Sequence, residues 1–235
     1  ALAIHPERRH IVTSRVEHPA VRVLCAHLAG QGYRVTELPV DKNGLLDMEQ
    51  LAASLTPDTA IVSLMWANNE TGVLFPVEKA AELAHERGIP FHTDAVQSTG
   101  KIPIDMKKNA IDMLAISGHK LHAPKGIGIL YVRRGTKFSP FLIGGHQEKG
   151  RRGGTENTPG IIGLGKACEL AARHLDRENN EVKRLRDKLE NSLLKLIPQS
   201  RVNGDLLQRL PNTTNISFEF VEGEGILLLM NEYGI

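Results

Sequence analysis

The first half of the chain alternates short apolar runs with amphipathic stretches, and no other feature constrains the fold as strongly. Runs rich in β-branched residues predict strands, whereas stretches that open on Pro and close on Gly predict helices. Strands that alternate with helices form a mostly parallel sheet with helices on both faces. The expected strands are residues 10–16, 35–40, 59–67, 89–96, 113–117 and 126–133, and the expected helices are residues 19–32 and 76–88.

The second half has a helical pattern, followed by a single strand. Residues 181–197 predict the strongest helix of the chain, because Leu recurs there at three- and four-residue spacing. The expected order is a mainly helical stretch over residues 157–197, a strand over 213–220 and a short helix over 224–233. We therefore expect an α/β large domain over residues 1–175 and the start of a smaller α+β domain over residues 176–235.

Composition excludes several classes of protein. The 235 residues carry 29 basic and 27 acidic side chains, a balance that does not favour nucleic acid or an acidic membrane as partner. Apolar runs stay shorter than the roughly 18 residues of a membrane span. The two cysteines, Cys25 and Cys168, form no CxxC pair, so neither a metal site nor a disulfide framework is expected. Such sparse cysteines fit a reducing, cytoplasmic location.

Ligands bind beyond the carboxyl ends of the strands in parallel sheets, so the loops after the strands hold the candidate residues. Lys120 directly follows the strand 113–117 in the segment Ser117-Gly118-His119-Lys120. A lysine in this place suits an amine that forms a Schiff base. The hydroxyl of Ser117 and the imidazole of His119 suit a phosphate. The alternative is a solvated loop lysine.

Asp94 and Gln97 stand at the end of another expected strand. A buried Asp needs a cationic partner, and a carboxylate beside a pyridine nitrogen would keep that nitrogen protonated. An Asp that caps the next helix is the alternative.

Three further candidates rest on weaker patterns. Asn69 lies in an Asn-Asn-Glu-Thr-Gly segment and could bond a phenolic oxygen, although a plain turn has the same composition. His18 could stack on a ring or shuttle protons, or only begin a helix. Thr155 lies in a glycine-rich basic loop that could bind phosphate, and either Asn157 or Thr155 could cap the helix that follows. Residues at the expected strand ends on one edge of the sheet are His18, Asn69, Asp94, Gln97, Ser117, His119 and Lys120.

Five segments of the chain closely resemble the cysteine desulfurases of the nitrogen-fixation type. The resemblance is carried by SRVEHPAV, MWANNETGVLFP, FHTDAVQSTGKIPID, SGHKLHAPKGIGILYVRR and GGHQEKGRRGGTEN. It implies an aminotransferase-like fold and the cofactor pyridoxal 5'-phosphate (PLP). It also implies an enzyme that takes sulfur from L-cysteine, leaving L-alanine and a protein persulfide for an iron–sulfur scaffold protein. A selenocysteine lyase and a catalytically silent scaffold remain alternatives.

The resemblance also implies a role for each candidate at the ring of the cofactor. Lys120 would form the Schiff base and then act as the catalytic base. Asp94 would pair with the pyridinium nitrogen. Asn69 and Gln97 would bond the ring oxygen. His18 would stack on the ring and act in proton transfer.

The phosphate and the partner subunit account for the remaining roles. Ser117 and His119 would hold the phosphate, and Thr155 would reach the phosphate of the other subunit, which implies a homodimer. The family's upstream phosphate loop is expected before residue 1. Its nucleophilic cysteine and its carboxylate-binding arginine are expected after residue 235. We therefore expect a fragment that cannot desulfurate by itself.

Overall fold

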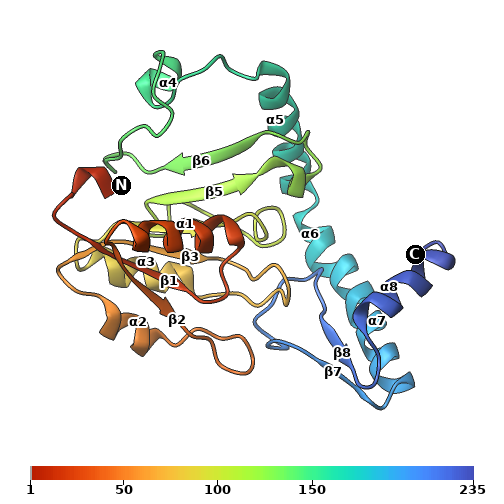
Figure 1. Ribbon diagram of the computed structural model, residues 1–235. Coiled ribbons are helices and arrows are strands. Elements are labelled where there is room, and N and C mark those ends of the chain that lie inside the picture. The colour runs from red at the N-terminus through yellow and green to blue at the C-terminus, as the bar shows by residue number, and fades with distance from the viewer. Residues whose placement is uncertain (1) are drawn as a thin grey trace.

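Residues 2–235 are described by a computed structural model, and within them six strands form one main sheet (Figure 1). The strand order is β2-β1-β3-β4-β5-β6; the first four pairings are parallel, and β6 runs antiparallel to β5. The expected mostly parallel α/β sheet is thus confirmed. The strands are β1 (His10–Ser14), β2 (Arg34–Leu38), β3 (Thr59–Met65), β4 (Phe91–Asp94), β5 (Met113–Ser117) and β6 (Gly128–Val132).

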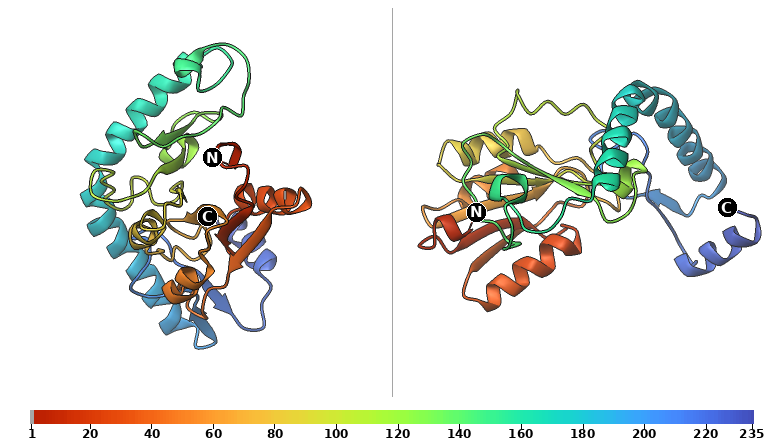
Figure 2. Two further views of the ribbon diagram at one scale, coloured as in Figure 1. Left: turned by 90° about the vertical axis from the view of Figure 1, so that its left-hand side faces the viewer. Right: turned by 90° about the horizontal axis from the view of Figure 1, so that it is seen from above.

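Helices cover both faces of this sheet. Helix α1 (Pro19–Gly30) lies on one face and α3 (Val77–His85) on the other (Figure 2). Between them the apolar side chains of the central strands form the core, because residues of parallel strands buried on both faces must be apolar throughout. Its fully buried members include Val12, Val62, Leu64 and Phe91.

Shorter elements connect these layers. Helix α2 (Met48–Ser54) precedes β3, and Asp47 caps it by accepting hydrogen bonds from the amides of Glu49 and Gln50. The turn of 3₁₀ helix η2 (Gly118–Leu121) follows β5. After β6 come the short α4 (Gln147–Gly150) and the long α5 (Thr158–Arg173).

The rear of the chain forms a smaller helical and stranded unit beside the main sheet (Figure 1). The antiparallel strands β7 and β8 pair with each other, and β7 packs on α7. Its elements are α6 (Leu175–Arg177), a π-helical turn (Glu178–Val182), α7 (Lys183–Leu196), β7 (Ser200–Val202), β8 (Ile216–Phe218) and α8 (Gly223–Glu232).

Helix α7 differs from the expected amphipathic helix in the face that it buries. Leu185, Leu189 and Leu196 are 49%, 54% and 77% exposed, whereas Arg186 and Glu190 are each only 6% exposed. These two polar residues bind the segment 204–215, so polar contacts, and not the leucine stripe, determine the orientation of this helix.

The segment 204–215 also attaches the smaller unit to the main sheet. The amide of Leu74 donates to the carbonyl of Gln208 at 2.9 Å, and the amide of Leu210 donates to the carbonyl of Gly72 at 2.8 Å. Both bonds lie in the loop between β3 and α3. None of the helices within residues 2–235 is long and apolar enough to cross a membrane.

Candidate active site

Parallel pairing brings the carboxyl ends of β1, β3, β4 and β5 to the same edge of the sheet (Figure 1). His18 follows β1 and Asn69 follows β3, while Asp94 and Ser117 are the last residues of β4 and β5. In the pairing register Asp94 stands between Met65 of β3 and Ala115 of β5. The topology therefore places all seven strand-end candidates on one edge, with Asp94 near its middle.

Asp94 is half-buried, and its Oδ1 accepts a hydrogen bond from the amide of Val96 at 2.9 Å. In the part of the chain that the structure describes, β5 is the next regular element after β4. The helix-capping alternative for Asp94 is therefore wrong. The bond fixes the carboxyl in a turn at the end of a strand.

His92 lies two residues before Asp94 and so faces the same side of β4. Its Nδ1 is 2.8 Å from the hydroxyl oxygen of Ser63 on β3. Burial lowers the pKa of His92, although the nearby Asp94 carboxylate opposes this shift. A neutral imidazole thus lies on the same side of β4 as the candidate carboxylate.

The segment around Lys120 is shaped by a close approach of two backbones. A Cβ at Gly118 would come within 2.9 Å of the carbonyl oxygen of Ile127, so this position requires glycine. The tight turn that follows exposes His119 and Lys120 at the sheet edge. The Ser117 hydroxyl oxygen lies 2.7 Å from Nδ1 of His119, which forms a hydroxyl–imidazole pair beside the lysine.

A cavity of about 670 Å³ opens between the loops after β4 and β5, helix α5 and the start of the π-helical turn at Glu178. Gln97, His119 and Lys120 line it together with Lys101 and Glu178. Burial lowers the pKa of Lys101; the Glu178 carboxylate opposes this shift and the Lys120 ammonium adds to it. Lys120 therefore lies within electrostatic range of a second lysine.

His18 and Asn69 have structural contacts of their own. Nδ1 of His18 accepts a hydrogen bond from the amide of Ala20 at 3.2 Å, so His18 does begin α1. The turn after β3 is built by Asn68, whose Oδ1 accepts from the amides of Glu70 and Thr71 at 3.0 and 2.9 Å. Asn69 itself donates to the Glu70 carboxylate at 2.7 Å.

Thr155 is exposed in the loop between α4 and α5. The cap of α5 is Asn157, whose Oδ1 accepts from the amide of Gly160 at 3.1 Å, so Thr155 is not the capping residue. Within residues 2–235 no hydrogen bond joins Thr155 to the strand-end candidates.

The sequence patterns did not single out three polar residues of this region. Glu17 precedes His18, His92 precedes Asp94 by two positions, and Lys101 follows Gln97 by four. Their nearness in sequence to stronger candidates was the available signal. Glu17 is the most buried of the three, at 4% exposed.

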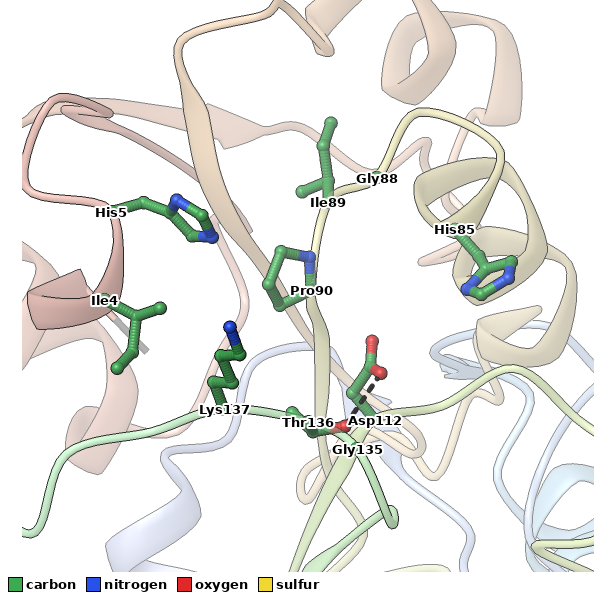
Figure 3. Close-up of a pocket in the computed structure, with 10 residues that line it drawn as sticks. All are labelled: Ile4, His5, His85, Gly88, Ile89, Pro90, Asp112, Gly135, Thr136 and Lys137. Atoms are coloured by element: carbon green, nitrogen blue, oxygen red, sulfur yellow. Dashed lines mark hydrogen bonds between the residues drawn. The ribbon is translucent and has the colours of Figure 1, made fainter.

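A second cavity, of about 290 Å³, lies at the opposite edge of the sheet (Figure 3). It is lined by residues that precede β4 and β5 and follow β6, and Asp112 there accepts a hydrogen bond from the Thr136 hydroxyl at 3.1 Å. None of the strand-end candidates contributes to its lining. It is therefore separate from the candidate site.

Neither cysteine lines the cavity at Lys120. Cys25 is buried in α1, and Cys168 lies half-buried in α5. Burial raises the pKa of both thiols, which lowers the fraction of reactive thiolate. Among the residues described, no cluster of three or more His, Cys, Asp or Glu side chains could hold a metal ion.

The aminotransferase class-V family profile matches residues 2–235. The chain belongs to this family. The chain is 60% identical over 235 residues to "Cysteine desulfurase NifS" of Azotobacter vinelandii, and it spans 58% of the length of that relative. This family assignment agrees with the resemblance to the desulfurases of the nitrogen-fixation type.

Two solved structures have the same fold as this chain. A "NIFS-LIKE PROTEIN" superposes with a TM-score of 0.95 at 38% identity, covering 100% of this chain and 64% of the other. "SspA in complex with cysteine" superposes with a TM-score of 0.81 at 36% identity, covering 96% and 62%. The expected aminotransferase-like fold is thus confirmed.

Proposed function

We propose that the protein containing this class-V chain is a PLP-dependent cysteine desulfurase, which converts L-cysteine to L-alanine and leaves the sulfur as a protein persulfide. The observation that carries this proposal is the set of groups at one sheet edge. Lys120 offers an amine, Asp94 a carboxylate, and Ser117 and His119 a hydroxyl–imidazole pair. The similar protein solved in complex with cysteine supports the choice of substrate.

The chemistry of these donors fits PLP group by group. Asp94 would pair with the ring nitrogen, Asn69 and Gln97 would bond the ring oxygen, and His18 would stack on the ring. Ser117 and His119 would hold the phosphate, which suits a hydroxyl and an imidazole. When bound, the cofactor supplies an electrophilic carbon for an amine and a ring that withdraws electrons.

The protein groups then have two tasks in proton transfer. The Asp94 carboxylate would hold a proton on the ring nitrogen. The Nζ of Lys120 would take the proton from the α-carbon of the substrate. His18 stands at the same edge and would act in proton transfer beside Lys120.

We further propose that the sulfur-accepting thiolate lies outside residues 1–235. The persulfide must form on a thiolate, and burial raises the pKa of both Cys25 and Cys168. The sulfur acceptor that we propose is an iron–sulfur scaffold protein, and unpaired cysteines suit a reducing, cytoplasmic setting.

We also propose that residues 176–235 begin a smaller domain, with 1–175 forming the cofactor domain.

Reductive trapping tests the central assignment. Borohydride reduction of the PLP-loaded whole protein, followed by peptide mapping, should leave the cofactor attached to Lys120. The Lys120→Ala variant should take up no label, whereas Lys125→Ala, an exposed lysine of the same loop, should label like the wild type. A cofactor mapped to Lys125, or a loaded protein without any label, would show that the assignment is wrong.

A further inference from the structure

Glu17 is a carboxyl group buried between two strand ends. It lies in the turn between β1 and α1, and only 4% of it is exposed. Its Oε1 accepts hydrogen bonds from the Ser14 hydroxyl at 2.7 Å and from the Met65 amide at 2.9 Å. These bonds join the last residue of β1 to the last residue of β3.

The second oxygen of Glu17 has no such contacts. Its Oε2 is buried and finds no hydrogen-bond partner among the described residues. A buried carboxylate oxygen without a donor is costly, whereas a protonated carboxyl avoids burying a charge. The contacts thus favour an uncharged carboxyl with its proton on Oε2.

Burial and the neighbouring charge of Asp94 also favour the uncharged form of Glu17. Burial raises the pKa of Glu17 to about 7, and the Asp94 carboxylate adds to the rise, while the bonds from Ser14 and Met65 oppose it. Cys25 of α1 lies within electrostatic range of Glu17, and the pKa of its thiol is raised by burial and by Glu17. Of two neighbouring carboxyls the more desolvated one takes the proton more readily, and here that one is Glu17.

We propose that Glu17 is a positioning residue of the cofactor site, an uncharged carboxyl that joins the ends of β1 and β3. This inference rests on the proposed function. Met65, which Glu17 holds, pairs with Asp94 in the register of β3 and β4. The loops that carry His18 and Asn69 begin at the two strand ends that Glu17 joins. Glu17 therefore acts on the cofactor through other residues.

Two substitutions in the PLP-loaded whole protein separate the charge of Glu17 from its hydrogen bonds. Glu17→Gln keeps an uncharged group whose oxygen can accept from Ser14 and Met65. Glu17→Ala removes the acceptor. The measurements are the dissociation constant for PLP and the pH midpoint of the visible absorption band of the bound cofactor. Glu37→Gln is the matched control, because Glu37 is an exposed carboxylate on β2 that also acts on Cys25.

We expect Glu17→Gln and Glu37→Gln to stay within about twofold of the wild type in PLP affinity, with an unchanged midpoint. Glu17→Ala should bind PLP about tenfold more weakly and shift the midpoint. If Glu17→Ala does not fold, Glu17→Asp, whose shorter side chain cannot reach both donors, takes its place with the same expected loss.

Three results would overturn the proposal. A Glu17→Gln variant as impaired as Glu17→Ala would mean that the carboxyl is charged. Variants that melt earlier but keep wild-type affinity and midpoint would mean that Glu17 only stabilises the fold. A wild-type protein that binds no PLP would overturn the proposed function as well, whereas the first two results leave that function intact.

Discussion

Asp94 and Glu17 are two carboxyl groups at one end of the sheet, and their surroundings differ. Asp94 is half-buried and accepts one hydrogen bond from the Val96 amide. Glu17 is buried, with one oxygen bonded twice and the other not at all. The two carboxyl groups therefore suit different tasks: Glu17 joins two strand ends, and Asp94 is the candidate partner of a ligand.

The first prediction concerns Asp94→Asn. The amide oxygen can still accept from the Val96 amide, so the turn and the bound PLP should be retained. An amide cannot hold a proton on the ring nitrogen, so deuterium exchange at the α-carbon of L-alanine should fall at least about a hundredfold. NMR of the whole protein in heavy water measures this exchange, and a wild-type rate in the PLP-loaded variant would contradict the role of Asp94.

The second prediction concerns the pH dependence of stability. The pKa of Glu17 rises from 4.5 to about 7 on folding, so the folded chain binds the proton more tightly. The stability that this proton contributes is fully present below about pH 4.5 and is lost as the pH rises through about 7. Between about pH 5 and about pH 8, the free energy of unfolding should fall by about 2–3 kcal/mol relative to Glu17→Gln.

The comparison with Glu17→Gln isolates this effect from two histidines. Burial lowers the pKa of His10 and of His92, so their contributions to stability rise with pH and oppose that of Glu17. Both histidines are present in both proteins and cancel in the difference. Urea unfolding at the two pH values gives the difference, and a value that does not change with pH would mean that Glu17 is ionised throughout.

At the scale of elements, the ion pair between Arg209 and Glu190 attaches α7 to the segment 204–215. Two guanidinium nitrogens each donate to one carboxylate oxygen at 2.7 Å, and the side chains are 4% and 8% exposed. The hydrogen bond from Arg209 lowers the pKa of Glu190, although burial opposes it. Removal of one partner would leave a buried charge without compensation.

The third prediction follows from this pair. Arg209→Met should lower the free energy of unfolding by about 3–5 kcal/mol, and the double variant that combines Arg209→Met with Glu190→Leu should lose much less. Lys183→Gln is the control on the same helix, because the Lys183–Asp187 pair is more exposed and should contribute less than about 1 kcal/mol. Urea unfolding measures the free energy of unfolding of each variant. Equal losses for the buried pair and the exposed pair would contradict the argument.

The sequence predicts the strands better than it predicts what the helices contact. The runs over β1, β3 and β5 are visible because β-branched and apolar residues are contiguous there. The buried face of α7 depends on Arg209 and Thr213, which lie 19 and 27 residues beyond their partners and leave no local pattern.

The same limit applies to the shortest elements and to the site. Helix α2 has seven residues and β7 has three, too few for a periodic pattern to show. The edge with Asp94 and Lys120 could be predicted, since parallel topology alone brings strand ends together. The burial of Glu17 could not, because it depends on a bond to Met65, 48 residues away.

At the scale of the whole molecule, we propose a homodimer, as the family resemblance implies, and Thr155 allows a test of it. Thr155 is exposed in the loop after α4, and within residues 2–235 it shares no hydrogen bond with Lys120 or its neighbours. The family resemblance assigns Thr155 to a phosphate in the other subunit. Each site of the proposed dimer would then combine Lys120 of one subunit with Thr155 of its partner.

The fourth prediction is that two impaired variants restore each other in such a dimer. Lys120→Ala alone should have no desulfurase activity, and Thr155→Ala alone should bind PLP about tenfold more weakly. When the two subunits are mixed and allowed to exchange, one site of each mixed dimer combines the intact Lys120 of one subunit with the intact Thr155 of the other. The other site carries both lesions.

Desulfurase activity at limiting PLP should therefore exceed the sum of the activities of the separate variants. Mixing Lys120→Ala with Asp94→Asn should restore no activity, because both residues belong to the same subunit's part of a site. A gain in the second mixture, or none in the first, would show that Thr155 does not serve the partner's site.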